Sequence, residues 1–96
     1  MPKAYMVGRI TITDQSKYDE YIKGASVAIA KYGAKMLARG GKYETLEGEG
    51  RGRNVLLEFE SMEAARTYYN SPEYQGAKAK REGAALADII IVEGVE

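Results

Sequence analysis

The order in which strand patterns and helix patterns follow one another constrains the fold of this chain more than any other feature of its sequence. Alternating side chains, typical of strands, occur in four segments: 4–12, 34–39, 53–60 and 87–93. Helical spacing fills two longer intervals, from Asp14 to about Tyr32 and from Ser61 to about Glu82. The resulting order, strand–helix–strand–strand–helix–strand, predicts an α+β fold of the ferredoxin-like βαββαβ type, a sandwich in which an antiparallel sheet carries its helices on one face.

Capping residues mark the ends of the predicted helices. Asp14 and Ser61 are placed to accept hydrogen bonds from the first helical amides, and Gly33 is placed to end the first helix in a left-handed turn. Ser71-Pro72 predicts a break in the second interval, because a residue before proline avoids the helical conformation and proline loses no hydrogen bond at a first helical position. Three tyrosines surround this corner, where they can shape a pocket wall as well as a core: Tyr68, Tyr69 and Tyr74.

Glycines mark the region between the two middle strands. Gly40-Gly41 predicts a bulge or bend in the second strand, which we expect to continue over Tyr43–Leu46. The segment Gly48–Gly52 is predicted to form a flexible turn. It joins two strands and lacks the lysine followed by serine or threonine of a P-loop, so a phosphate-binding loop is not expected.

Length and charge limit the class of protein. At 96 residues the chain is predicted to form a single domain over residues 1–96. Its 14 basic and 14 acidic residues cancel, so no overall field attracts nucleic acid or an anionic membrane surface. No apolar run approaches the roughly 20 residues of a membrane span, and the N-terminus lacks the apolar stretch of a signal peptide. We therefore expect a soluble cytoplasmic protein.

The chain contains no cysteine and no histidine. Disulfides, thiolate nucleophiles, Cys-type metal sites and a Ser-His-Asp triad are therefore excluded. A metal would need oxygen ligands alone, and no Asp-x-Asp loop is present, so we predict neither a metal site nor a cofactor. An enzyme of this composition would work with carboxylates, tyrosines, lysines or arginines, or with chemistry supplied by its substrate.

Sorting the predicted strand residues by alternation separates the two faces of the sheet. One face is apolar and is expected to lie under the helices: Met6, Ile10, Ile12, Met36, Ala38, Val55, Leu57, Phe59, Ile89 and Ile91. The opposite face, which we call the open sheet face, combines apolar and charged side chains: Tyr5, Val7, Leu37, Leu56, Ile90, Val92, Arg9, Arg39, Glu58 and Asp88. Because a large exposed apolar patch usually marks an interface, we predict a homodimer through the open sheet face, related by a two-fold axis.

Several short motifs in this sequence are similar to those of one family. They are Tyr69-Asn70-Ser71-Pro72-Glu73-Tyr74-Gln75, Arg81, Asp88, Val92-Glu93-Gly94, Gly40-Gly41, Leu46-Glu47-Gly48, Leu57-Glu58-Phe59, Ser61 and Ala64-Ala65. Together they extend over nearly the whole chain, which resembles the uncharacterised family called domain of unknown function 1330. The resemblance implies a dimeric α+β barrel, the superfamily that includes small cofactor-independent monooxygenases, muconolactone isomerases and chlorite dismutase-like proteins, but no single reaction. Relatives often carry tryptophan where this chain has Tyr68.

The charges of the open sheet face are the first candidate site residues. In the functional interpretation, Glu58 and Arg39 are catalytic: the arginine orients a carboxylate or enolate and the glutamate acts as base. Arg9 and Asp88 then bind the ligand. In the structural interpretation, all of these charges form salt bridges that fix the register of the dimer.

Residues around the Ser-Pro corner, with one tyrosine on the open sheet face, are further ligand-binding candidates: Tyr5, Tyr69, Tyr74 and Arg81. Their structural alternatives are core or corner packing for the tyrosines and a solvated helix face for the arginine. The sequence thus predicts a small homodimer that binds a small organic molecule, aromatic or carboxylated, in a cavity at the open sheet face. If it is catalytic, the expected class is cofactor-free proton transfer, isomerisation or oxygenation. The alternative is a non-catalytic structural or interaction module with a filled dimer interface.

Overall fold

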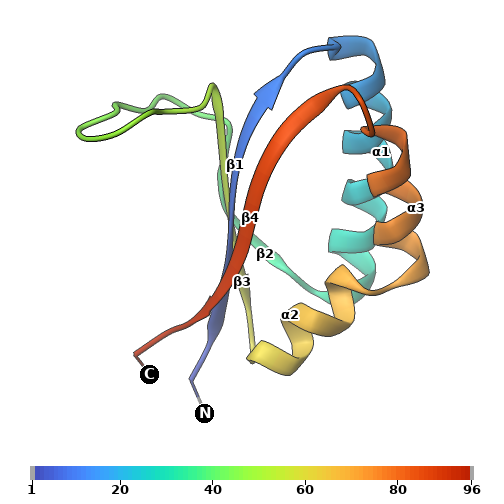
Figure 1. Ribbon diagram of the computed structural model, residues 1–96. Coiled ribbons are helices and arrows are strands. Elements are labelled where there is room, and N and C mark those ends of the chain that lie inside the picture. The colour runs from blue at the N-terminus through green and yellow to red at the C-terminus, as the bar shows by residue number, and fades with distance from the viewer. Residues whose placement is uncertain (1, 96) are drawn as a thin grey trace.

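A four-stranded antiparallel sheet carries three helices on one face in the computed structural model, which describes residues 2–95 (Figure 1). The elements follow in the order β1 (Ala4–Ile12), α1 (Gln15–Tyr32), β2 (Lys35–Arg39), β3 (Arg53–Phe59), α2 (Met62–Tyr69), α3 (Pro72–Lys80) and β4 (Ala85–Glu93). The strands lie in the order β2-β3-β1-β4. The predicted ferredoxin-like βαββαβ fold is confirmed, with its second helical part divided into α2 and α3.

Side chains cap the helices at the predicted residues. Asp14, Ser61 and Ser71 accept hydrogen bonds from the backbone amides three residues further along, at 3.3, 3.0 and 3.1 Å. Pro72 is the first residue of α3, and Gly33 ends α1 with φ at 69°, in the left-handed region that favours glycine. These local interactions place the corner between α2 and α3 over the sheet.

The bulge in β2 lies ahead of Gly40-Gly41, where a bulge or bend was predicted and where the structure has a bend at Gly40. Met36 of β2 pairs with Leu57 of β3, whereas Ala38 pairs with Leu56 and Arg39 with Val55. The register of the two strands therefore shifts between Met36 and Ala38 rather than at Gly40-Gly41. A bulge sets two residues against one and reverses the alternation beyond it. The predicted faces of Ala38 and Arg39 are therefore wrong. Ala38 lies on the open sheet face, and Arg39 faces the helices.

Residues 40–52 form an arm that projects from the sheet on the side opposite the helices (Figure 1). The predicted continuation of the second strand over Tyr43–Leu46 is wrong, because no strand is present in this segment. Gly40 and Gly48 adopt φ of 65° and 74°, which breaks an extended strand. The arm is tied to the sheet where Arg9 Nη2 donates a hydrogen bond to the Glu49 carbonyl at 2.6 Å.

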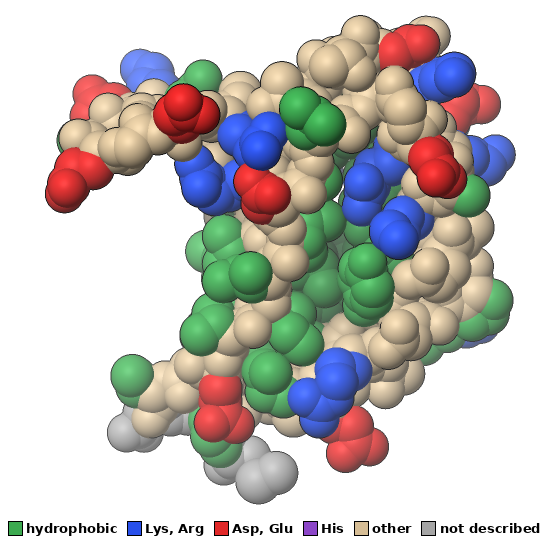
Figure 2. Space-filling view, viewed as in Figure 1, with side chains coloured by type: hydrophobic (Ala, Val, Ile, Leu, Met, Phe, Trp, Pro, Cys, Tyr) green, Lys and Arg blue, Asp and Glu red, His purple; other side chains and the backbone are tan. Residues whose placement is uncertain are grey.

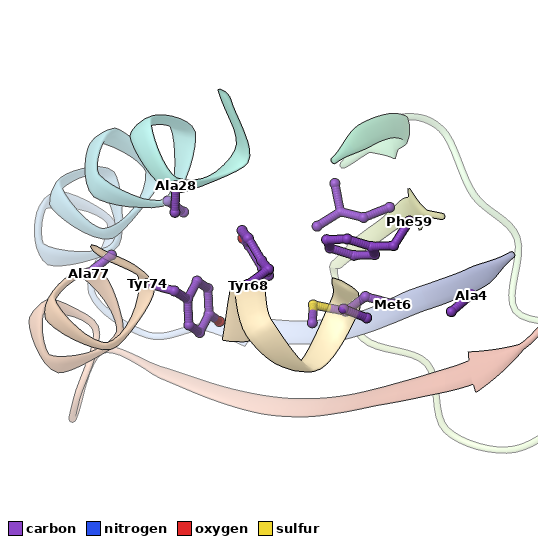
Figure 3. Close-up of a cluster of buried hydrophobic side chains, with 10 residues drawn as sticks. Ala4, Met6, Ala28, Phe59, Tyr68, Tyr74 and Ala77 are labelled. Carbon is purple, nitrogen blue, oxygen red and sulfur yellow. The ribbon is translucent and has the colours of Figure 1, made fainter. Parts of the chain in front are cut away.

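The core lies between the sheet and the helices, as predicted. Met6, Ile10, Leu57 and Phe59 are buried there, and further predicted residues pack against the core as partly buried side chains: Met36, Val55, Ile89 and Ile91. Figure 3 shows Tyr68 between Tyr74 and Phe59, and its ring centroid is 5.0 and 5.2 Å from theirs. The largest fully buried side chains are all tyrosines: Tyr18, Tyr68 and Tyr74.

The open sheet face is apolar and is not covered by the chain's own helices. Ile90 is 59% exposed and Val92 46%, and Leu37 from β2 is 43% exposed. Figure 2 shows hydrophobic side chains gathered on this side of the sheet, below the arm. The structure therefore has the exposed apolar face from which the sequence predicted a partner subunit.

Candidate functional site

A cavity of about 80 Å³ lies between the sheet and the helices. Apolar side chains of all four strands form its floor, and α1 forms much of its roof. Tyrosines from all three helices line it: Tyr18, Tyr21, Tyr68 and Tyr74. This cavity is on the helix side of the sheet, so the prediction of a cavity at the open sheet face does not describe it.

Gly8 creates space in the floor of the cavity. It is a buried residue of the central strand β1, paired with Val55 on one side and Ile89 on the other. A Cβ atom added to Gly8 would approach no atom closer than 3.6 Å, the distance to Ile10 Cδ1. Glycine inside a strand lowers stability because it packs no side chain. At this position the missing side chain leaves room above the sheet.

A pair of hydrogen-bonded tyrosines lies beside this space. The Tyr21 and Tyr74 hydroxyl oxygens are 2.9 Å apart, and their rings meet edge to face with centroids 6.0 Å apart. The Arg81 guanidinium lies 5.1 Å from the centroid of the Tyr21 ring, within the range of a cation–π interaction. Tyr21 of α1 and Tyr74 of α3 thus meet at the wall of the cavity, and Arg81, the residue after α3, lies over the Tyr21 ring.

The buried phenols of the cavity are neutral hydrogen-bond donors. Burial raises the pKa of Tyr18, Tyr21 and Tyr68 above the usual value for tyrosine, and the neighbouring Tyr74 raises the pKa of Tyr21 and Tyr68 further. These side chains stay protonated near neutral pH. Their hydroxyl groups are suited to donate hydrogen bonds to a negatively charged atom.

Two arginines line the end of the cavity near the start of β3. Arg53 is half-buried, and its guanidinium carbon lies 5.7 Å from the centroid of the Tyr18 ring. Its Nε is buried and has no hydrogen-bond partner. Arg39 lines the same cavity while its side chain is largely exposed. None of the salt bridges among residues 2–95 includes Arg39, Arg53 or Arg81, and no acidic side chain lines the cavity.

The predicted charged residues of the open sheet face have partners within the chain. Arg9 and Asp88 are opposite each other on β1 and β4. Asp88 accepts a hydrogen bond from Arg51 Nε at 2.8 Å, and Glu58 accepts one from Lys3 Nζ at 3.3 Å. Within the chain these two carboxylates pair with Lys3 and Arg51, and salt bridges that fix the register of a dimer stay a prediction.

Glu58 and Arg39, the predicted catalytic pair, lie on opposite faces of the sheet. Glu58 is opposite Tyr5 on β1 and Lys35 on β2, whereas the bulge turns Arg39 toward the helices. The structure therefore does not bring the predicted base and the predicted anion-binding arginine into one site. Tyr5 lies with Glu58 on the open sheet face.

The residues predicted at the Ser-Pro corner come closer together. Tyr74 lines the cavity, and Arg81 lies near it over Tyr21. The Tyr69 ring is 5.1 Å from that of Tyr74, but Tyr69 faces a separate groove of about 290 Å³ beside β4, which it shares with Ile90. Figure 2 shows the molecule from the β4 edge, with a hollow lined by hydrophobic side chains between β4 and the helices.

Sequence reasoning missed the importance of Gly8 and Arg53 and did not single out Tyr18 and Tyr21 as candidate site residues. The alternation of β3 contained the signal for Arg53, which has the same parity as Val55. A charged residue on an otherwise apolar face under helices is unusual and indicates a functional or paired charge. Gly8 likewise interrupts the apolar series of β1.

Two kinds of feature are absent from the described residues. Between residues 2 and 95 no group of three or more acidic side chains is placed to hold a metal ion. Within the same range no helix has both the length and the apolar character needed to cross a membrane.

Comparisons with known proteins identify the family and the fold. Residues 3–95 match the family model described as Domain of unknown function (DUF1330). The chain belongs to the DUF1330 family. No curated protein is significantly similar to this DUF1330 chain.

Solved structures resemble the DUF1330 chain in fold at low sequence identity. The RPA0582 protein of unknown function from Rhodopseudomonas palustris is 17% identical, with a TM-score of 0.78 over 99% of this chain and 84% of that protein. A dimeric protein of unknown function with a ferredoxin-like fold from Bacteroides fragilis is 12% identical, with a TM-score of 0.66 over 95% of each chain. SnoaB, a cofactor-independent oxygenase from Streptomyces nogalater, is 8% identical, with a TM-score of 0.62 over 100% of this chain and 96% of that enzyme. These similarities show that the chain shares the ferredoxin-like fold of these proteins.

Proposed function

We propose that this DUF1330 protein is a homodimer that binds a small organic molecule in the cavity between its sheet and its helices. The observation that carries the proposal is the space above Gly8, which is walled by tyrosines and reached by arginines without carboxylate partners. Small-molecule sites are mostly apolar clefts with a few convergent polar groups, and this cavity has that composition. Its volume of about 80 Å³ limits the ligand to a compact molecule.

The homodimer is proposed to form through the open sheet face. The Bacteroides fragilis relative is described as dimeric, and exposed apolar side chains such as those of this face usually mark an interface with another subunit. Ile90→Asp should convert the dimer to a monomer in light scattering at micromolar concentration. Val27→Asp is the matched control, because Val27 on α1 is 60% exposed and Ile90 is 59% exposed. A dimer that survives Ile90→Asp but not Val27→Asp would refute this interface.

If the protein is catalytic, its cavity favours the stabilisation of negative charge. Neutral phenols and arginines are donors that stabilise an oxyanion or enolate as it develops. Glu58 cannot serve as base there, because it lies on the opposite face of the sheet. The proton acceptor would have to come from the substrate or from water. Cofactor-free isomerisation or oxygenation fits this pattern, and SnoaB shares the fold, although a shared fold does not by itself imply a shared reaction.

A non-catalytic dimeric module is the second candidate. The observation that favours it is the internal pairing of Glu58 and Asp88, which leaves these predicted site residues engaged by Lys3 and Arg51. In this case the open sheet face serves only for association, and the helix-side cavity is a packing defect. The non-catalytic candidate predicts that filling the cavity stabilises the protein and changes no ligand binding.

A cavity-filling series at Gly8 separates the two candidates. Gly8→Ala adds one carbon atom at ordinary contact distance, 3.6 Å or more from its neighbours, and Gly8→Val adds two more beside the cavity that Gly8 lines, so both variants are expected to remain folded and dimeric. A thermal-shift screen of small acids and phenols should raise the melting temperature of the wild type, because a ligand that binds only the folded state stabilises it. The same compounds should act progressively less on Gly8→Ala and Gly8→Val. Equal shifts in all three proteins, or no shift in any, would refute binding in this cavity.

A further inference from the structure

We propose that the ligand of this cavity is a compact carboxylate anion, whose carboxylate is bound by Arg39 and Arg53 and whose apolar part lies over Gly8. The inference rests on the proposed function, and it adds the chemical class of the ligand and its orientation. It follows from the backbone around the two arginines, from their lack of partners and from the size of the cavity.

The backbone directs both arginines to one corner of the cavity. Arg39 is opposite Val55, and Arg53 lies two residues before Val55 on the same face of β3. Diagonal neighbours of this kind on adjacent strands are about 7–8 Å apart at Cα, within reach of long side chains. The bulge between Met36 and Ala38 is what places Arg39 on this face. Bulges often redirect a side chain toward a functional site.

Gly40 makes room for the second arginine. A Cβ at Gly40 would be 2.6 Å from Arg53 Nη1 and 3.2 Å from its guanidinium carbon. The guanidinium of Arg53 therefore lies against the bare backbone of the residue that follows Arg39. The bulge in β2 and the glycine that follows the strand thus place the two arginines beside each other at one end of the cavity.

Among residues 2–95, neither of these two arginines has an anionic partner, whereas Arg51 has one. Arg51 donates to the Asp88 carboxylate at 2.8 Å and to the Thr11 hydroxyl at 3.0 Å. In contrast, Arg53 has a buried Nε with no acceptor, and neither Arg39 nor Arg53 takes part in a salt bridge among residues 2–95. A buried donor without an acceptor is unfavourable. A carboxylate matches the planar fork of a guanidinium and would supply the missing acceptor.

The exposure of the two side chains gives the orientation of the ligand. Arg39 is exposed and Arg53 is half-buried, so positive charge extends from solvent into the cavity. Beyond them the cavity is lined by apolar side chains and neutral phenols, which favour an uncharged body. Its volume of about 80 Å³ is below the roughly 150 Å³ of an engineered cavity that holds benzene. The three-carbon body of a short branched carboxylate such as isobutyrate is half the size of benzene and fits this limit when its carboxylate stays at the arginines, whereas the ring of benzoate would require side chains to move.

Pairs of acids and amides of equal shape test the inference. Isobutyrate and isobutyramide, and benzoate and benzamide, are titrated into the dimer by calorimetry in a buffer free of carboxylate and phosphate. We expect isobutyrate to bind about tenfold or more tightly than isobutyramide, the difference of a charge-assisted hydrogen bond. Isobutyrate should also bind more tightly than benzoate. Arg53→Met should weaken the binding of isobutyrate about tenfold and leave the binding of isobutyramide unchanged. Lys23→Met is the control, because Lys23 is an α1 lysine whose side chain is 79% exposed.

The outcomes distinguish this inference from the proposed function. If isobutyramide binds as tightly as isobutyrate and Gly8→Val abolishes both, the cavity binds ligands but the anion inference is wrong. If isobutyrate binds and Lys23→Met weakens it as much as Arg53→Met does, the anion is held by general surface charge and the inference is also wrong. If no probe binds, both proposals fail for compact ligands. Should Arg53→Met not fold by circular dichroism, Arg39→Met at the exposed rim provides the same comparison.

Discussion

The contact between α1 and α3 at Gly24 offers a sharp test of how the helical layer is built. A Cβ added to Gly24 would be 2.7 Å from Ala77 Cβ and 3.2 Å from Ala77 Cα, closer than packed atoms can lie. One helical turn earlier on the same two helices, Tyr21 and Tyr74 share their 2.9 Å hydrogen bond. The close approach at Gly24 therefore sets the separation of the two helices where they wall the cavity.

Gly24→Ala should destabilise the protein, although alanine is the better helix former. Replacing an interior helical glycine with alanine contributes about 1 kcal/mol of helix propensity. Forcing a methyl group into a packed contact costs roughly 1–3 kcal/mol. Gly76→Ala is the matched control, because Gly76 lies inside α3 and a Cβ there meets no atom within 4 Å. Both variants gain the same helix propensity, so the difference between their free energies of unfolding measures the cost of the contact at Gly24.

Thermal unfolding at equal protein concentration measures that difference. We expect Gly76→Ala to be more stable than Gly24→Ala by about 1–3 kcal/mol. For a domain of this size 1 kcal/mol corresponds to about 4–8 °C, so the gap in melting temperature should be at least about 4 °C. Gly24→Ala should also perturb the Tyr21 and Tyr74 hydroxyl environment. If the two variants have the same melting temperature, the close packing of α1 against α3 at Gly24 is wrong.

Two further predictions concern named side chains. Tyr74→Phe removes the partner of the Tyr21 hydroxyl, so the free energy of unfolding in urea should fall by about 0.5–1.5 kcal/mol, and an unchanged midpoint would contradict this bond. The hydrogen bond from Lys31 lowers the pKa of Glu73 from 4.5 to about 2, with help from its own backbone amide and the Tyr32 hydroxyl. Because the folded pKa is the lower one, the stabilisation is present above pH 4.5 and is lost as the pH falls toward 2. The difference in stability between wild type and Glu73→Gln should therefore shrink over this range in urea titrations, and a difference that persists to pH 2 would contradict the shift.

The elements of the fold were predictable because their signals are local. Asp14, Ser61 and Ser71 cap helices through contacts three residues away, and Gly33 ends α1 through its own backbone conformation. The bulge in β2 was not predictable in this way. Nothing in Lys35–Arg39 distinguishes regular pairing from pairing with one extra residue, since the choice depends on how β3 is matched across the sheet.

That single misplaced bulge accounts for most of the error in the candidate site. With regular alternation Arg39 belongs to the open sheet face beside Glu58, and the two form a plausible catalytic pair. In the structure they are on opposite faces, and the cavity collects Arg53 and the tyrosines of α1 instead. The Ser-Pro corner was located correctly, because proline and serine fix its geometry without reference to the sheet.

The irregular pairing of β2 also has an evolutionary consequence. Loss of Leu37, the extra residue between Met36 and Ala38, would restore regular pairing. Ala38 would stay opposite Leu56 and Arg39 opposite Val55, so the Arg39 side chain would remain on the cavity side of the sheet. A single codon deletion would thereby remove one exposed apolar side chain from the open sheet face and keep the arginine of the cavity. Among descendants of such a chain, a change in the length of this strand would affect subunit association more than ligand binding.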